Sequence, residues 1–226
     1  IIFSKYLLID KIFYIYIFIN FVFYNLIYFY LIKNYKSIFF IYFYLSGASM
    51  LMLERGNIEI LIFILIFFVF FSKNFIKIIL LCSVISLKIF PFFSIISQLM
   101  KYRYVFICCL LFSVTYFFYI YDDLAFIFKN TPSTGDMSYG TKSISSNLVK
   151  HFDININNYL ISVTFAILTL IFYLTHFKNY LKNVKYNHEE MFLSGGTIYS
   201  ATFLINSNHD YRMIFLFLII PLILQL

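Results

Sequence analysis

The chain has 226 residues, of which 62% are hydrophobic and only 12% are charged, and its mean hydropathy is +0.88. Soluble domains are about 45–50% apolar and about 25% charged, so this composition excludes an ordinary water-soluble domain, whose polar surface would not cover so much apolar side chain. The net charge of +7 does not indicate nucleic-acid binding, because the basic residues lie singly or in pairs between apolar runs.

We therefore expect an all-α, polytopic transmembrane bundle with the lipid bilayer as its partner and no nucleic acid. A helix crosses a hydrocarbon core of about 30 Å with about 20 apolar residues. In chain order, the apolar runs occupy residues 12–32, 37–53, 58–72, 75–100, 104–121, 159–177, 191–205 and 213–226. They predict a single integral membrane domain over residues 1–226 with about seven spans. Because residue 1 is not Met and the last run has no basic flank, we expect a fragment truncated at both ends.

The run 75–100 differs from the others, because it contains Lys88 and Pro91 near its middle. A proline inside a helix removes a backbone hydrogen bond and kinks or breaks the helix. A single crossing would also place Lys77 and Arg103 on opposite faces, against the positive-inside rule. We therefore expect a broken, re-entrant helical hairpin, with two short helices that meet near Lys88 and Pro91.

With this hairpin, the charges fall into two groups that give the orientation. The inner face has nine basic residues against Glu189 and Glu190, whereas acids and bases nearly balance outside. The inner basic residues are Lys33, Lys36, Lys73, Lys77, Lys101, Arg103, Lys178, Lys182 and Lys185. This pattern predicts a multi-pass protein of the cytoplasmic (inner) membrane. Residues 122–158 then form an extracytoplasmic loop, which at 37 residues is longer than most connections and is either a functional lid or disordered.

The first candidate site lies in the outward break between the runs 37–53 and 58–72. In one interpretation Asn57 is the N-cap of the following helix and Glu59 interacts favourably with the helix dipole. In the other, Arg55 presents its guanidinium to a phosphate, and Glu54 or Glu59 contacts a hydroxylated substrate or holds Arg55. Asn57 is then a substrate-binding residue as well.

The second candidate site is the outward break before the last run, together with the tip of the hairpin. His209 and Asp210 are candidates for the general acid or base, and Tyr211 and Arg212 for substrate binding, with Arg212 as an anion ligand. The alternative is an ordinary hydrophilic loop with a weak surface ion pair. Lys88 either extends from mid-run to the surface or is directed at the same outer face from the hairpin tip.

Three segments in order resemble membrane proteins of glycosyltransferase family 87. They are ERGNIEILIFILIF with Arg55-Gly-Asn57, SLKIFPFF with Lys88 and Pro91, and NHDYRMIFLFLIIP with Asp210-Tyr-Arg212 and Pro221. The resemblance covers roughly residues 47–226. It implies a helical GT-C fold and an enzyme that transfers a hexose or pentose from a polyprenyl-phosphate-linked donor to a glycan or lipid acceptor on the extracytoplasmic side, in cell envelope biosynthesis.

The resemblance implies that no nucleotide sugar is needed, and we expect no cofactor and assign no metal-binding residue. The family's general-base Asp lies in the first outside loop, and Asp10 is the one carboxylate near the corresponding part of this chain. The alternatives are a transporter or flippase of a lipid-linked sugar or another anion, and a non-catalytic subunit of a respiratory or assembly complex. The transferase hypothesis requires that a set of five side chains gather at one membrane face: Glu54, Arg55, Lys88, Asp210 and Arg212.

Overall fold

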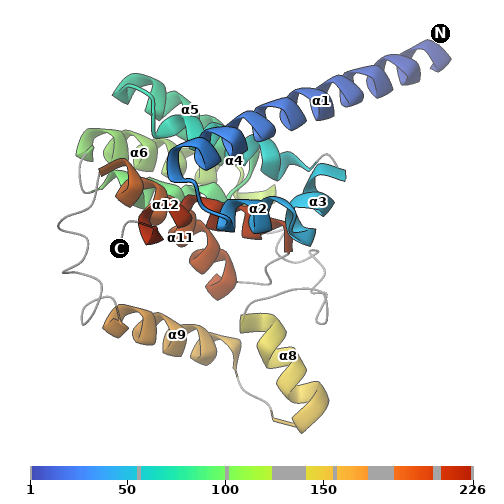
Figure 1. Cartoon of the computed structure of the whole chain (residues 1–226). Coiled ribbons are helices and arrows are strands. Elements are labelled where there is room, and N and C mark those ends of the chain that lie inside the picture. Colours follow the sequence, from blue (N-terminus) through green and yellow to red (C-terminus); the bar gives the residue numbers. More distant parts are fainter. Residues whose placement is uncertain are drawn as a thin grey trace.

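The structure, a computed structural model, describes residues 2–54, 57–99, 102–123, 141–154, 157–172, 186–205 and 210–224. Throughout this part the secondary structure is helical and contains no strand, which confirms the all-α class (Figure 1). The main elements are α1 (Ile2–Tyr35), α2 (Phe39–Tyr44), α3 (Gly47–Glu54), α4 (Ile58–Val69), α5 (Asn74–Leu87), η1 (Phe90–Gln98), α6 (Arg103–Tyr119), α8 (Thr141–Phe152), α9 (Asn158–Phe172), α11 (Tyr186–Ile205), η5 (Asp210–Leu218) and α12 (Ile220–Ile223). The two elements labelled η are 3₁₀ helices.

Helix α1 is the one helix of the described part that is both long and apolar enough to cross a bilayer, over Ile12–Tyr35. It projects from the rest of the molecule (Figure 1), and most of its apolar side chains are exposed. The apolar helices α4, α5 and α6 have 12, 14 and 17 residues. At about 1.5 Å per residue they extend about 18–26 Å, less than the hydrocarbon core of about 30 Å. One helix of the described part therefore meets the length criterion, and the expectation of about seven spans stays a prediction.

The helices are shorter than the apolar runs of the sequence because the chain breaks inside several of these runs. The run 75–100 divides into α5 and η1, and Lys88 between them has an extended backbone, with φ −153° and ψ 154°. Pro91 follows as the second residue of η1, where its missing N–H costs no helical hydrogen bond. The sequence predicts a break at this point, and the structure has one.

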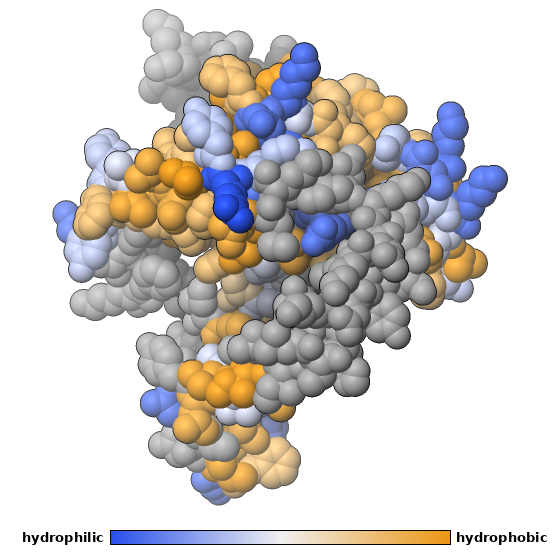
Figure 2. Space-filling model, turned by 90° about the vertical axis from the view of Figure 1, so that its left-hand side faces the viewer, coloured by the Kyte–Doolittle hydropathy of each residue, from blue (hydrophilic) through white to orange (hydrophobic). Residues whose placement is uncertain are grey.

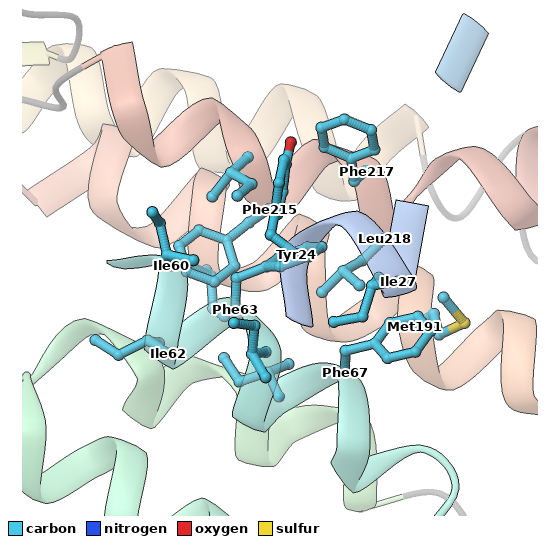
Figure 3. Packing of buried hydrophobic residues seen from close by; sticks show 14 of the residues in the cluster. Tyr24, Ile27, Ile60, Ile62, Phe63, Phe67, Met191, Phe215, Phe217 and Leu218 are labelled. Atoms are coloured by element: carbon cyan, nitrogen blue, oxygen red, sulfur yellow. The ribbon is translucent and has the colours of Figure 1, made fainter. Parts of the chain in front are cut away.

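The core packs the aromatic side chains of α1, α4 and η5 against one another (Figure 3). The ring of Phe217 lies 6.3 Å from that of Tyr24 and 6.2 Å from that of Phe63, centroid to centroid. The ring of Phe215 also lies 6.3 Å from that of Phe63 and 5.6 Å from that of Phe90. These edge-to-face and tilted contacts hold η5, the last long element, against the first half of the chain.

The directions of η1 and α11 follow from two hydrogen bonds. Gln98 Nε2 donates to Glu190 Oε1 at 2.7 Å, and Thr197 Oγ1 donates to the carbonyl oxygen of Phe93 at 3.0 Å. Five residues of 3₁₀ helix rise about 10 Å and seven residues of α-helix about 10.5 Å, so the two contacts are in register only if the elements run antiparallel. The beginning of η1 therefore lies toward the end of α11.

The segment expected as the extracytoplasmic loop 122–158 contains helix α8, a difference from the sequence prediction, while residues 124–140 and 155–156 lie outside the described part. The physical reason is a helical spacing inside the polar composition. Ile144, Leu148, Val149 and Phe152 fall at i, i+4, i+5 and i+8, which places them on one face of a helix. Helix α8 contacts α9 and α11.

Candidate functional site

The break between α5 and η1 carries an ion pair between Lys88 and Glu59, in which Lys88 Nζ donates to Glu59 Oε1. The Glu59 side chain is fully buried, whereas 31% of the Lys88 side chain is exposed. A buried carboxylate is costly unless it is paired and hydrogen-bonded. Lys88 therefore neutralises Glu59 while part of its own side chain stays accessible from outside the protein.

Glu59 reaches this position because α4 begins just before it. Asn57 is the N-cap: its Oδ1 accepts a hydrogen bond from the Glu59 N–H at 3.3 Å, and its backbone is extended with ψ 141°. Glu59 lies in the first turn, where the positive end of the helix dipole favours a negative charge. The other carboxylate oxygen, Oε2, is buried and has no hydrogen-bond donor among the described residues.

Two replacements of Asn57 test its role as the N-cap of α4. We expect Asn57→Ala to lower the free energy of unfolding by about 1 kcal/mol, because the Glu59 N–H loses its acceptor, and Asn57→Asp to retain it. Thermal unfolding of both variants measures this difference. Equal stability of the two variants would contradict the capping role.

The start of η5 lies at the same end of the bundle as Lys88. Helix α11 ends at Ile205, and the four residues 206–209 connect it to η5, which begins at Asp210. Residues Phe215 and Leu218 of η5 lie against Gly195 in the middle of α11. The beginning of η1 also lies toward the end of α11, so all these segments meet at one end of the bundle. We call it the Lys88 end; it contains Lys88, Glu59, Ile205 and the backbone of Asp210.

The other candidate residues from the sequence are described only in part. Helix α3 ends at Glu54 and contacts η5 and α4. The side chains of Glu54, Asp210, Tyr211 and Arg212, and the whole of Arg55 and His209, lie outside the described residues. Of the nine candidates, the structure brings Glu59 and Lys88 into contact and places Asn57 beside Glu59 through the cap.

A second buried ion pair joins Lys77 of α5 to Glu190 of α11, with Nζ and Oε1 2.6 Å apart. Their side chains are 2% and 0% exposed. Gln98 at the end of η1 donates to the same Glu190 oxygen, and Lys77 Nζ lies 4.4 Å from the centroid of the Tyr102 ring. The cluster thus connects α5, η1 and α11 at the opposite end of the bundle, which we call the Lys77 end.

The charge pattern of the sequence predicts Lys77 and Glu190 at the inner face but does not indicate that they pair. The two residues are separated by 113 positions, and no local spacing relates them. The sequence contained one indication of this pair: Lys77 lies inside an apolar run and Glu190 directly precedes another. A charge in such a position requires a partner. Among the described residues, no group of three or more His, Cys, Asp or Glu side chains has the arrangement of a metal site.

Comparisons of the chain with protein families, with curated proteins and with solved structures find no match.

Proposed function

We propose that this protein is a polytopic membrane glycosyltransferase of the GT-C type. It moves a hexose or pentose from a polyprenyl-phosphate donor to a glycan or lipid acceptor on the extracytoplasmic side of the cytoplasmic membrane. The observation that carries the proposal is the Lys88–Glu59 ion pair at the break between α5 and η1. It lies at the end of the bundle where α11 ends and η5 begins.

The chemistry requires a cation for the donor phosphate and an acceptor for the proton of the incoming hydroxyl. Lys88 supplies a half-buried cation, and positive groups aimed at a leaving phosphate stabilise the charge that develops there. Glu59 Oε2 is a buried acceptor without a donor in the described part of the chain, which suits a sugar hydroxyl. Arg55 and Arg212 are the further candidate cations.

In the proposed reaction the acceptor hydroxyl oxygen forms a bond to the anomeric carbon of the sugar. The bond from that carbon to the phosphate oxygen breaks, and polyprenyl phosphate leaves with the electron pair. The hydroxyl proton passes to a carboxylate or imidazole, for which the candidates are Asp210, His209 and Glu54. No cofactor takes part in this scheme.

The exposed surface supports the membrane location. Much of the described surface in Figure 2 is formed by hydrophobic residues, and exposed large apolar side chains occur on α1, α5, α6 and α9. Apolar areas of this extent are rare on soluble monomers. Contact with lipid explains how helices of such composition remain stable.

A transporter or flippase of a lipid-linked sugar is the second candidate. It is favoured by the buried Lys77–Glu190 pair beside the broken segment α5–η1, because discontinuous helices and paired buried charges occur at the binding sites of transporters. Transport and transfer differ in whether a glycosidic bond forms.

The test uses membranes that contain the full-length protein, incubated with radiolabelled polyprenyl-phosphate sugars. We expect label to appear in a glycan or glycolipid acceptor, and Lys88→Met to lower the transfer rate about 100-fold, the effect of removing one stabilising group from an active site. Lys73→Met is the matched control, because Lys73 is exposed and directly precedes the first residue of α5, at the end of the helix away from Lys88. We expect the Lys73→Met variant to transfer at the parental rate.

Equal transfer rates for Lys88→Met and Lys73→Met would overturn the assignment of the site. Movement of the labelled donor across the membrane without formation of a glycosidic bond would support the transporter instead. Thermal unfolding of each variant excludes loss of the fold as the cause of lost transfer.

A further inference from the structure

Helix α8 is mostly polar, with eight polar residues among its 12, yet two of its four apolar side chains are exposed. The side chains of Val149 and Phe152 are 43% and 69% exposed. The helix has 12 residues and extends about 18 Å, too short to cross a bilayer. A short amphipathic helix of this kind is stable either against another protein surface or in the boundary between water and lipid.

The turn after α8 adds to the same exposed surface. Asp153 has a left-handed backbone with φ 56°, which Asp tolerates better than most residues. The N–H groups of Asp153 and Ile154 donate to the carbonyl oxygens of Val149 and Leu148 at 3.1 and 3.2 Å. The chain is thereby folded back on α8, and Ile154, 46% exposed, extends the apolar surface of Val149 and Phe152.

The charge of α8 fits an anionic lipid surface. The helix contains Lys142, Lys150 and His151 and no acidic residue, and the turn after it contains one exposed acid, Asp153. Lys150 and His151 lie in the last turn, where they also interact favourably with the helix dipole. A polar face with basic residues beside an apolar face is the pattern of helices that lie in the plane of a membrane surface.

The position of α8 relative to its neighbours indicates where that surface lies. Helix α8 contacts α9 and α11, and Ser162 Oγ near the start of α9 donates to the carbonyl oxygen of Leu204 at 2.7 Å. Leu204 lies at the end of α11, so α9 begins at the Lys88 end of the bundle. Apolar residues of α9 are exposed as well, including Val163 at 57%. Figure 1 shows α8 and α9 together in the lower part of the molecule.

We propose that α8 lies in the headgroup region of the outer leaflet beside the Lys88 end, with Val149, Phe152 and Ile154 in the acyl boundary and Lys150 at an anionic phospholipid headgroup. This inference rests on the proposed membrane location. It gives the Lys88 end a lipid surface from which a polyprenyl-phosphate substrate, itself an anionic lipid, reaches the ion pair at Glu59.

The protein has no tryptophan, so a single introduced tryptophan reports one position without background. The full-length protein is reconstituted into lipid vesicles that contain bromine-labelled phosphatidylglycerol or phosphatidylcholine, since bromine quenches tryptophan fluorescence on contact. We expect Phe152→Trp to be quenched by the labelled lipids, and more strongly in phosphatidylglycerol. Ser146→Trp, which is exposed and off the apolar face, is expected to be quenched by aqueous acrylamide instead.

A second variant tests the charge. In Phe152→Trp combined with Lys150→Gln, we expect the difference between the two lipids to decrease, because one cation facing the headgroups is lost. An unchanged preference for phosphatidylglycerol would exclude Lys150 from headgroup binding.

Val163→Trp in α9 distinguishes this inference from the proposed function on which it rests. If labelled lipid quenches Val163→Trp while Phe152→Trp is quenched by acrylamide alone, α8 does not lie on the lipid surface, although the membrane location stands. If labelled lipid quenches neither variant, the proposed membrane location itself is wrong. Quenching of both by labelled lipid, with Ser146→Trp left accessible to acrylamide, supports the inference.

Discussion

Glu190→Gln is expected to lower the free energy of unfolding by about 3–5 kcal/mol and the melting temperature by about 6–20 °C. The reason is that Lys77, 2% exposed, loses the only carboxylate that it is paired with in the described interior. The adjacent Tyr102 ring and the amide of Gln98 do not replace a carboxylate. A thiol-reactive fluorogenic dye measures the transition, because Cys109 is fully buried in the folded chain.

The double replacement Lys77→Met with Glu190→Met is expected to be much closer to the parental stability than either single variant. Two apolar side chains of similar length avoid the cost of burying charge, and replacements of buried ion pairs by hydrophobic residues are often neutral or stabilising. The control is Glu189→Gln, at the neighbouring half-buried position, where burial raises the pKa of the carboxyl. We expect a change within about 0.5 kcal/mol there, and additive losses from the two Met replacements would contradict the pairing.

Gly195→Ala is expected to cost about 3 kcal/mol or more, since a Cβ at this position would lie 2.3 Å from the carbonyl oxygen of Phe215 and 2.9 Å from Leu218 Cβ. The first contact is with backbone, so α11 and η5 would have to move apart rather than one side chain rotate. Because η5 begins at Asp210, we also expect lost transfer activity. Dye-detected unfolding and the radiolabel assay measure the two effects.

Gly196→Ala is the matched control for this close approach. A Cβ at Gly196 has Ile219 Cδ1 as its nearest neighbour at 3.9 Å, an ordinary contact. Both glycines lie inside α11, so the gain in helix propensity of about 1 kcal/mol applies to both positions. The difference between the two variants therefore measures the contact between α11 and η5, and similar melting temperatures for both would show that this contact is not tight.

The sequence alone determined the helical class and the place of the main break. Apolar runs without strand patterning favour helices, and a lysine followed three residues later by proline cannot continue one. The cap at Asn57 was also predictable, because it depends on residues two positions apart. These features are local, so a single stretch of chain contains all the information that decides them.

The lengths of the helices and the presence of α8 were harder to predict. Hydropathy marks where apolar residues are, but it does not register that the run 37–53 divides into α2 and α3 around Leu45 and Ser46, where a Ser-Gly pair favours a turn. In residues 141–152 the polar composition concealed an apolar face of four side chains. Composition averages over a window, whereas helix formation depends on the spacing of apolar residues within it.

Which charges pair with one another was decided by the tertiary structure alone. Lys88 and Glu59 are 29 positions apart, and Lys77 and Glu190 are 113 apart. The sequence identified Lys88 and Glu59 as separate candidates, and their contact arises because α4 and α5 pack as antiparallel neighbours. The pairing of Lys77 with Glu190 needs α11 to lie against η1 and α5, which side-chain packing fixes and no local pattern encodes. A charged residue within an apolar run indicates that a partner is needed, but only the packing of the helices determines which residue that partner is.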